Sequence, residues 1–231
     1  VVLRGLDGTG VGGGGEVMKR VGLIRVLTTT DCDLLNLHGR QIQSLFPELE
    51  VVSRCIPDHP EGVHDEITHS TAVPQVVKLA RTFRDEGFDA VIVSCAGDPG
   101  VAEAQEEVDI PVIGAGRAAA SIALSLGGRV GVLGITERAP DAMVEVLGPA
   151  MVAYVQPEGV STTLDLMREE GKASAINAAS LLKQQGAQVI VLACTGLSTI
   201  GAAQAIAEAT GLKVVDPVVA EGLVAYYAVN F

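Results

Sequence analysis

The fold is decided by the stretch VIVSCAGDPG at residues 91–100, because the chain carries a second version of it, VIVLACTGLS at residues 189–198. Each stretch is an apolar run of strand length that ends in a cysteine and breaks into a turn containing glycine. Continuous Val- and Ile-rich runs of this kind are typical of buried parallel strands. Cys95 and Cys194 are therefore expected at equivalent strand ends, roughly 100 residues apart.

The sequence around these two strands also repeats, in the same order. RVGLIRVLT at residues 20–28 matches RVGVLGITE at residues 129–137. In each copy the predicted segments alternate between strand and helix, and the amphipathic helix before the cysteine strand ends at a glycine, where a left-handed cap is expected. The flanking segments are 33–46, 49–55, 73–86 (ending at Gly87), 99–107, 109–114 and 117–126 in the first copy, and 140–147, 151–157, 174–185 (ending at Gly186), 199–210, 212–217 and 218–227 in the second.

This alternation predicts an α/β protein made of two duplicated, flavodoxin-like lobes. Each lobe would be a short parallel sheet flanked by helices. We expect a pseudo-twofold axis between the lobes and the active site between them, because ligands of open α/β sheets bind at the carboxyl ends of the strands. Residues 1–17 have a Gly-rich composition that resembles a tag or linker, so we leave them out of the fold prediction.

Composition narrows the possible partners. The chain has 28 acidic and 16 basic residues, a net charge of −12, which argues against binding to nucleic acid or to an anionic membrane. Hydrophobic residues make up 48% and aromatic residues only 3%, so the core must consist of Val, Leu, Ile and Ala. No stretch has the length and composition of a bilayer span, and no secretory signal is visible. We therefore expect a cytoplasmic protein with reduced thiols.

The two strand-end cysteines suggest acid–base chemistry. A thiol beside a helix N-terminus is expected to have a lowered pKa, because the helix dipole favours the thiolate. One thiolate and one thiol on opposite sides of a bound molecule could remove a proton from one face of a carbon and return one to the other. A buried structural cysteine is the ordinary alternative, and it is the better interpretation for Cys32 and Cys55, which have no counterparts in the repeat.

At these residues the sequence resembles the aspartate/glutamate/hydantoin racemase superfamily. SCAGDPG at 94–100 is similar to the first cysteine motif of the hydantoin racemase branch, and ACTGLST at 193–199 to the second. The resemblance implies two similar α/β domains, one catalytic cysteine from each, and no cofactor. It also implies that the final helix of each copy crosses to the other lobe, so lobe 1 would comprise residues 18–114 plus 218–231 and lobe 2 residues 115–217. We further expect a homo-oligomer.

Departures from the family pattern point to the substrate. Amino-acid racemases of the superfamily usually carry Cys-Asn-Thr in the first motif, whereas this chain has Cys95-Ala96-Gly97, and Arg25 lies near a position where an Asp is common. A carbon already activated by a carbonyl and a ring nitrogen needs less assistance. The favoured substrate is therefore a 5-substituted hydantoin or a related cyclic ureide. An aspartate/glutamate-type racemase and a non-catalytic two-lobed binding protein remain alternatives.

Several residues would support catalysis by virtue of their positions. The backbone N–H groups of Ala96, Gly97, Thr195 and Gly196 could hold the oxygen that becomes enolate-like as the proton leaves. Arg25 and Thr136, near the ends of the first strands of the two copies, should border the cleft; a solvated Arg25 and a helix-capping Thr136 are the alternatives. We expect Asp98 to cap the helix that follows Pro99, and Thr195 or Ser198 to cap the helix after Cys194. The predicted substrate-binding residues are Arg25, Ala96, Gly97, Asp98, Thr136, Thr195 and Gly196.

Two further motifs suggest other ligands. VIGAGRAAAS at 112–121 satisfies the dinucleotide pattern G-x-G-x-x-A, but it follows the fourth strand of its copy, so we attribute its glycines to close packing. HPEGVHDEITH at 59–69 holds three of the four histidines. Its spacing does not match a helical metal-binding pair, so we expect a polar loop or lid and no metal.

Overall fold

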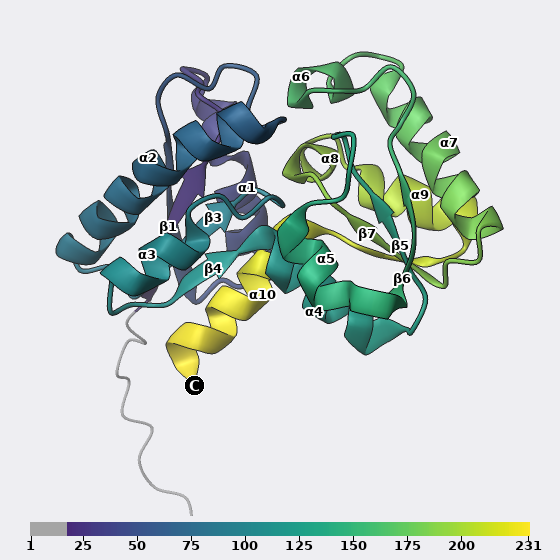
Figure 1. The fold of residues 1–231 in the computed structure, drawn as a ribbon. Helices are drawn as coiled ribbons and strands as arrows, with labels where there is room; N and C mark the ends of the chain where they lie inside the picture. The colour runs from purple at the N-terminus through teal and green to yellow at the C-terminus, as the bar shows by residue number, and fades with distance from the viewer. Residues whose placement is uncertain (1–17) are drawn as a thin grey trace, which may run out of the picture.

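The computed structural model describes residues 18–231, and the predicted tag or linker at 1–17 lies outside the described residues. Two four-stranded parallel sheets form the framework, with strand orders β2-β1-β3-β4 and β6-β5-β7-β8 (Figure 1). The first strand of each copy lies between the second and third strands in both sheets. The predicted fold, a duplicated pair of parallel α/β lobes, is confirmed.

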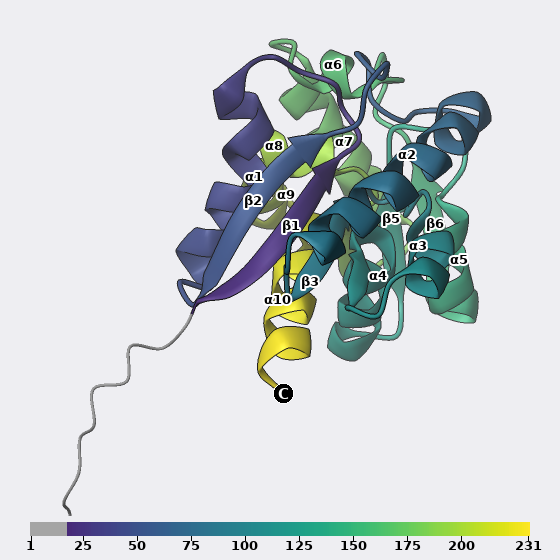
Figure 2. The same cartoon turned by 90° about the vertical axis from the view of Figure 1, so that its left-hand side faces the viewer.

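Among the described residues, the first copy of the repeat supplies the first sheet and four helices. The elements are β1 (Lys19–Arg25), α1 (Cys32–Leu45), β2 (Leu49–Cys55), α2 (Glu66–Asp85), β3 (Ala90–Ser94), α3 (Val101–Glu107), β4 (Val112–Gly114) and α4 (Ala115–Leu126). Figure 2 shows α1 on one face of this sheet and α2 and α3 on the other. Gly87, just beyond α2, has the left-handed backbone expected from the sequence.

The second copy repeats this order with small changes. Its elements are β5 (Val130–Leu133), α5 (Asp141–Leu147), a 3₁₀ turn (Gly148–Ala150), β6 (Met151–Val155), α6 (Thr163–Leu166), α7 (Gly171–Gln184), β7 (Val189–Leu192), α8 (Thr195–Thr199), α9 (Ala202–Thr210), β8 (Lys213–Val215) and α10 (Pro217–Asn230). The helix predicted at 199–210 begins three residues late, as α9 at Ala202, because Gly201 in the left-handed region precedes it, and α8 is an additional helix before it.

One core joins the lobes, and each lobe has a second core on its outer side. Side chains of β3 alternate between them, as expected for a strand: Ala90 and Ile92 belong to the shared core, and Val91 and Val93 to the outer core of the first lobe. The shared core also contains the Ala-rich face of α4, whose small side chains allow close approach of α10. This core therefore packs the two sheets and the two helices together.

Helices α4 and α10 link the lobes. Helix α4 follows β4 of the first sheet but packs on α5 and β7 of the second half, and α10 follows β8 but packs on β3 and α1 of the first. We keep the division into residues 18–114 plus 218–231 and residues 115–217 as a proposal, which these contacts support.

Helix α2 begins seven residues before the predicted start at residue 73, and it includes Pro74. The reason is local. The Asp65 side chain accepts a hydrogen bond from Thr68 N, and Thr68 in turn bonds the cap residue, so a capping box starts the helix at Glu66. The His-rich stretch is thus a loop that runs into the first turns of a helix.

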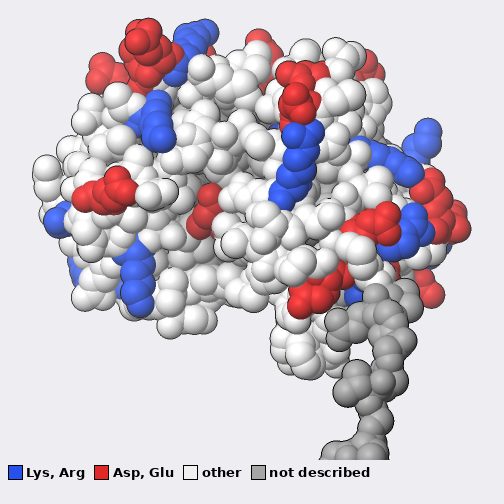
Figure 3. Space-filling model, turned by 180° about the vertical axis from the view of Figure 1, so that it is seen from behind, with Lys and Arg blue, Asp and Glu red and all other residues white. Residues whose placement is uncertain are grey.

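Figure 3 shows one face on which Lys and Arg side chains lie singly among Asp and Glu side chains and form no continuous basic area. Within residues 18–231, none of the helices combines the length and the apolar character needed to cross a bilayer.

Candidate active site

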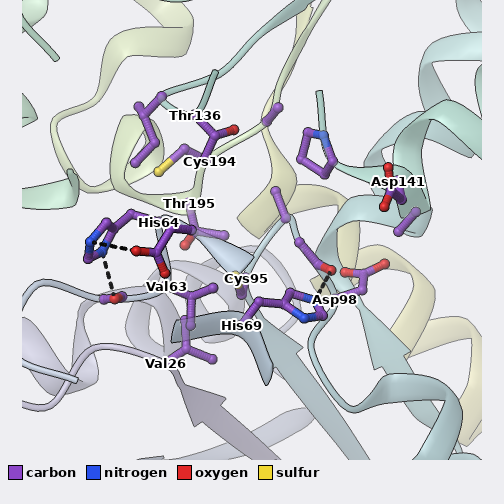
Figure 4. A pocket seen from close by; sticks show the side chains of 18 of the residues that line it. Val26, Val63, His64, His69, Cys95, Asp98, Thr136, Asp141, Cys194 and Thr195 are labelled. Carbon is purple, nitrogen blue, oxygen red and sulfur yellow. Dashed lines mark hydrogen bonds and ion pairs between the residues drawn. The ribbon is translucent and has the colours of Figure 1, made fainter. Parts of the chain in front are cut away.

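A cleft of about 830 Å³ opens between the lobes at the carboxyl ends of the strands. Its walls are the loops after β1, β3, β5 and β7, together with the start of α2 and the segment around α6. Figure 4 shows Cys194 and Thr136 on one side and Cys95 and His69 on the other. All nine residues predicted for the site line this cleft: Arg25, Cys95, Ala96, Gly97, Asp98, Thr136, Cys194, Thr195 and Gly196.

Cys95 follows the last residue of β3 and is 8% exposed. Its carbonyl accepts a hydrogen bond from Asp98 N at 3.0 Å, which closes a tight turn in which Asp98 has a positive φ of 49°. Burial raises the pKa of the Cys95 thiol to about 12, although the Gly97 N–H lowers it. Cys194 and Asp98 raise the pKa further because their negative charges oppose the thiolate.

Cys194 occupies the N-cap position of α8, and its Sγ accepts a hydrogen bond from Gly196 N at 3.3 Å. The expectation that Thr195 or Ser198 caps this helix is therefore wrong. Burial raises the pKa of the Cys194 thiol, and the N–H groups of Gly196 and Leu197 and the Thr163 hydroxyl act in the opposite direction. The sulfur of Cys194 thus lies at a site that can accommodate a thiolate.

The prediction that helix dipoles lower the pKa values of the two thiols is also wrong, because both pKa values are raised. Helix α8 is only five residues long, and α3 begins at Val101, well beyond Cys95. The dipole of so short or distant a helix is outweighed by removal of the thiolate from water. Both cysteines are therefore thiols at neutral pH, and an accepting group or a bound molecule must favour the thiolate.

Asp98 caps a helix, but not the one predicted. Its Oδ1 accepts a hydrogen bond from Gly116 N at 2.7 Å and its Oδ2 from Arg117 N at 2.8 Å, so it caps α4. Helix α3 has Gly100 at its N-cap, with no side-chain hydrogen bond. Burial raises the pKa of Asp98 to about 7, and the two N–H groups of α4 lower it. Asp98 thereby fastens the Cys95 loop to the next helix.

The glycines of the dinucleotide-like motif make room for this loop. A Cβ at Gly114 would collide with the Asp98 carboxylate, and one at Gly116 with the Ala96 carbonyl oxygen. Close packing, which the sequence favoured over a dinucleotide site, accounts for both glycines. The packing partner is the cysteine loop.

Arg25 is buried and points its guanidinium at α1, donating from Nη1 to the Leu34 carbonyl at 2.7 Å and the Leu35 carbonyl at 3.3 Å. The solvated alternative is excluded. Burial lowers the pKa of Arg25 to about 10, while the nearby Glu221 raises it in part. Arg25 therefore contributes positive charge close to the cleft, and its Nη1 is engaged by the carbonyls of α1.

Thr136 lies in the wall of the second lobe and does not cap α5, which has Pro140 at its N-cap without a side-chain bond. Its Oγ1 donates to the Arg138 carbonyl at 2.8 Å, and its own carbonyl accepts from the Tyr154 hydroxyl at 2.5 Å. The capping alternative is wrong. Thr136 instead shapes the loop after β5.

A family model described as Asp/Glu/Hydantoin racemase matches residues 22–221, which include both cysteine loops and nearly all of the described elements. The chain belongs to this family. Among curated proteins it is similar to a hydantoin racemase of Pseudomonas sp. (strain NS671), 25% identical over 151 residues, which cover 60% of this chain and 57% of that protein. It is also similar to a hydantoin racemase of Rhizobium meliloti, 30% identical over 76 residues.

The match to the Rhizobium meliloti protein covers 33% of this chain and 32% of that relative. The matched segments therefore span 57% of the Pseudomonas racemase and 32% of the Rhizobium racemase. Among solved structures, allantoin racemase from Klebsiella pneumoniae superposes with a TM-score of 0.77 at 22% identity, covering 92% of this chain and 90% of that one. Glutamate racemase from Bacillus anthracis gives 0.68 at 16%, covering 91% and 81%. These structures share the fold of this Asp/Glu/hydantoin racemase family member.

Some cleft residues of this family member were not picked out as site residues from the sequence. His69, on α2, brings its Nε2 to 3.2 Å from the Gly97 carbonyl in the Cys95 loop, and His64 also lines the cleft. His59 instead turns inward and bonds to the Pro57 carbonyl at 2.7 Å. Within the part of the chain that the structure describes, no three His, Cys, Asp or Glu residues cluster as a metal site.

Proposed function

We propose that this protein is a cofactor-independent, two-base racemase of 5-substituted hydantoins or related cyclic ureides. The observation that carries the proposal is the placement of Cys95 and Cys194 in opposite walls of one cleft, at equivalent strand ends of a duplicated fold. Two acid–base groups on opposite faces of one carbon are what inversion by proton transfer requires. The partner is thus a small molecule.

Before the first turnover one cysteine loses its proton to water, and the step then balances without any co-reactant. The thiolate of one cysteine takes the proton from the substrate carbon, and the electron pair moves onto the neighbouring carbonyl oxygen. The thiol of the other cysteine then donates its proton to the opposite face, and the carbonyl re-forms. Which of Cys95 and Cys194 acts as base depends on the enantiomer bound. At the end the two cysteines have exchanged protonation states.

The four backbone amides expected to support the reaction divide into two kinds of role. The N–H groups of Gly97 and Gly196 face the sulfurs of Cys95 and Cys194, so they stabilise the thiolates. The N–H groups of Ala96 and Thr195, one residue earlier in each loop, would receive the developing enolate oxygen. In each loop, one backbone N–H group would bind the substrate oxygen and the next would bind the cysteine sulfur.

The charges around the cleft favour an uncharged ring over an α-amino acid. Arg117 donates to Glu145 at 2.7 Å, Arg138 to Asp141 at 2.7 Å, and Arg25 to the carbonyls of α1. Each of these guanidinium groups already has a carboxylate or carbonyl partner, so its charge is partly offset before the carboxylate of aspartate or glutamate binds. The carbonyl and N–H groups of a hydantoin need only neutral hydrogen-bonding partners.

Cα–H exchange in D₂O, followed by NMR with polarimetry alongside, tests the function. The panel comprises enantiopure 5-substituted hydantoins, allantoin, aspartate and glutamate. We expect exchange together with loss of optical rotation on a cyclic ureide. Exchange on an amino acid alone would make the protein an amino-acid racemase and overturn the substrate class. Binding of a hydantoin without exchange would instead identify a non-catalytic binding protein.

Cytoplasmic location and a homo-oligomeric state are proposed on the sequence reasoning and the family resemblance given above. The acidic net charge of −12 and the interspersed surface charges agree with a small-molecule partner in place of a nucleic acid.

A further inference from the structure

A chain of buried polar side chains runs behind the two cysteines. Ser94 Oγ donates to Glu221 Oε1 at 2.7 Å and lies 2.8 Å from His38 Nδ1, while His38 Nε2 lies 2.9 Å from Thr199 Oγ1. The members come from four elements: Glu221 from α10, Ser94 from β3, His38 from α1 and Thr199 from α8. Glu221 and His38 are fully buried.

The hydroxyl groups at both ends of His38 have other acceptors for their protons. Ser94 Oγ donates to Glu221 and Thr199 Oγ1 donates to the Thr195 carbonyl at 3.3 Å, so both hydroxyl oxygens can accept from the ring, and the tautomer of His38 decides which one does. Burial, aided by the charge of Arg25, holds the pKa of His38 well below its ordinary value, so the imidazole is neutral. Burial also holds the pKa of Glu221 well above its ordinary value.

The chain joins the two catalytic loops across the lobe interface. Ser94 is the residue directly before Cys95, and Thr199 is the last residue of α8, whose N-cap is Cys194. A second tie runs parallel to it, since Thr195 Oγ1 donates to the Ser94 carbonyl at 3.2 Å. One imidazole therefore lies between the segments that carry the two sulfurs.

We propose that His38 and Glu221 are positioning residues that hold the Cys95 and Cys194 loops at a fixed separation for two-base chemistry. Where it concerns catalysis, this rests on the proposed function. Inversion requires both sulfurs to align with one carbon at the same time, and a misplacement of about 1 Å in such a site costs on the order of 10²-fold in rate. A chain that bonds both loops controls that separation.

The repeat shows that the fold alone does not require a carboxyl group at the place of Glu221. Counted from the N-caps Gly114 and Asp216, the residue of α4 that corresponds to Glu221 is Ala119, also fully buried. An alanine thus suits this place in a linking helix. A buried carboxyl group is costly, and Glu221 Oε2 has no hydrogen-bond partner among the described residues. The buried carboxyl group therefore lies in α10, the helix that packs against β3, the strand before Cys95.

Paired variants of the full-length protein separate positioning from simple packing. His38→Leu and Glu221→Leu remove the hydrogen bonds, whereas His38→Gln and Glu221→Gln keep a donor and an acceptor at each place. Val218→Ala, another fully buried position on α10, is the control for lost stability. Thr199→Val breaks the chain at its other end with almost no change of shape and serves if a leucine variant fails to fold.

Two readouts are used. Racemization is measured in both directions, and iodoacetamide alkylation of Cys95 and Cys194 is followed by peptide mass spectrometry. In the leucine variants and Thr199→Val we expect kcat to fall by similar factors in both directions, about 10- to 100-fold, with KM nearly unchanged. We also expect the alkylation rates of both cysteines to change together. The glutamine variants should restore most of both properties.

Equal behaviour of the leucine and glutamine variants, or the same loss in Val218→Ala, would overturn the proposal and leave the chain a packing feature. Alkylation needs no substrate, so the two proposals fail separately. If the wild-type protein racemizes nothing on the panel, the proposed function fails, and the alkylation rates of the paired variants still decide whether His38 and Glu221 position both cysteines.

Discussion

The two cysteine loops occupy equivalent places in a duplicated fold, yet they are built differently. After β3 the chain makes a tight turn with a left-handed Asp98 before α3 begins at Val101. After β7 the cysteine itself caps α8, which begins at the next residue. The space around the two loop glycines differs as well. A Cβ at Gly97 would meet only ordinary contacts, whereas at Gly196 it would press on Thr163 Cγ2 at 2.8 Å.

Each cysteine loop is hydrogen-bonded to a linking helix through a carboxylate, but the carboxylate belongs to the loop in one lobe and to the helix in the other. In the first lobe the carboxylate belongs to the cysteine loop, where Asp98 caps α4 next to Gly114. In the second lobe it belongs to the helix, where Asp216 caps α10 and accepts a hydrogen bond from the loop residue Ser198 at 2.8 Å. The duplication thus preserved the fastening of loop to helix, while the residues that perform it changed places.

The largest expected effect tests whether both loops are catalytic. Cys95→Ala and Cys194→Ala should each lower racemization by about 10²–10⁴-fold, because each removes one of two required proton-transfer groups. Polarimetry in both directions measures the loss. Cys55→Ser, a change outside the cleft, is the control and should leave the rate unaltered. Wild-type rates in both cysteine variants would remove the two-base mechanism.

The next effect tests the difference in space around the loops. Gly196→Ala should lower kcat by about 10- to 100-fold, because the new methyl group pushes against Thr163 and the Cys194 sulfur, 3.2 Å away, and displaces the loop. Gly97→Ala should stay close to wild type, since its nearest contacts are at 3.6 and 3.7 Å. Steady-state kinetics of the pair measures the contrast, and equal losses would show that the loops are equally packed.

A pH effect on stability sharpens the comparison of the thiols. Burial raises the pKa of Cys95 from 9.0 to about 12, so the unfolded chain loses this proton at lower pH than the folded protein. The contribution of Cys95 to stability is therefore complete below about pH 9 and is lost as pH rises toward about 12. Thermal unfolding should show a steeper alkaline loss in wild type than in Cys95→Ser. Parallel curves would contradict the burial of this thiol.

The smallest effect concerns the two caps. Asp98→Ala and Asp216→Ala should each lower the free energy of unfolding by about 0.5–2 kcal/mol, because each leaves the first N–H groups of a helix without an acceptor. Denaturant unfolding measures both. The asparagine variants keep one acceptor and should lose less. If only one of the two alanine variants is destabilised, the fastenings of the two loops are not equivalent.

Much of the fold could be predicted from local pattern. The segment 49–55 was expected as a strand and is β2, and the left-handed glycines after α2 and α7 lie where the periodicity ends. The start of α2 was missed because a capping box at Asp65 outweighs the breaking tendency of Pro74. The break between α8 and α9 was missed because it depends on a single left-handed glycine.

In the candidate site, too, some features follow from the sequence and others only from the tertiary structure. The repeat of two apolar runs ending in Cys95 and Cys194 determined that two thiols stand at equivalent strand ends, because strand period and connection order are properties of the chain itself. Only the tertiary structure decided that Asp98 caps α4, that burial raises the thiol pKa values, and that His38 joins Ser94 to Thr199. Those outcomes depend on contacts between residues far apart in sequence and on the exclusion of water, and neither is encoded in a local pattern of residues.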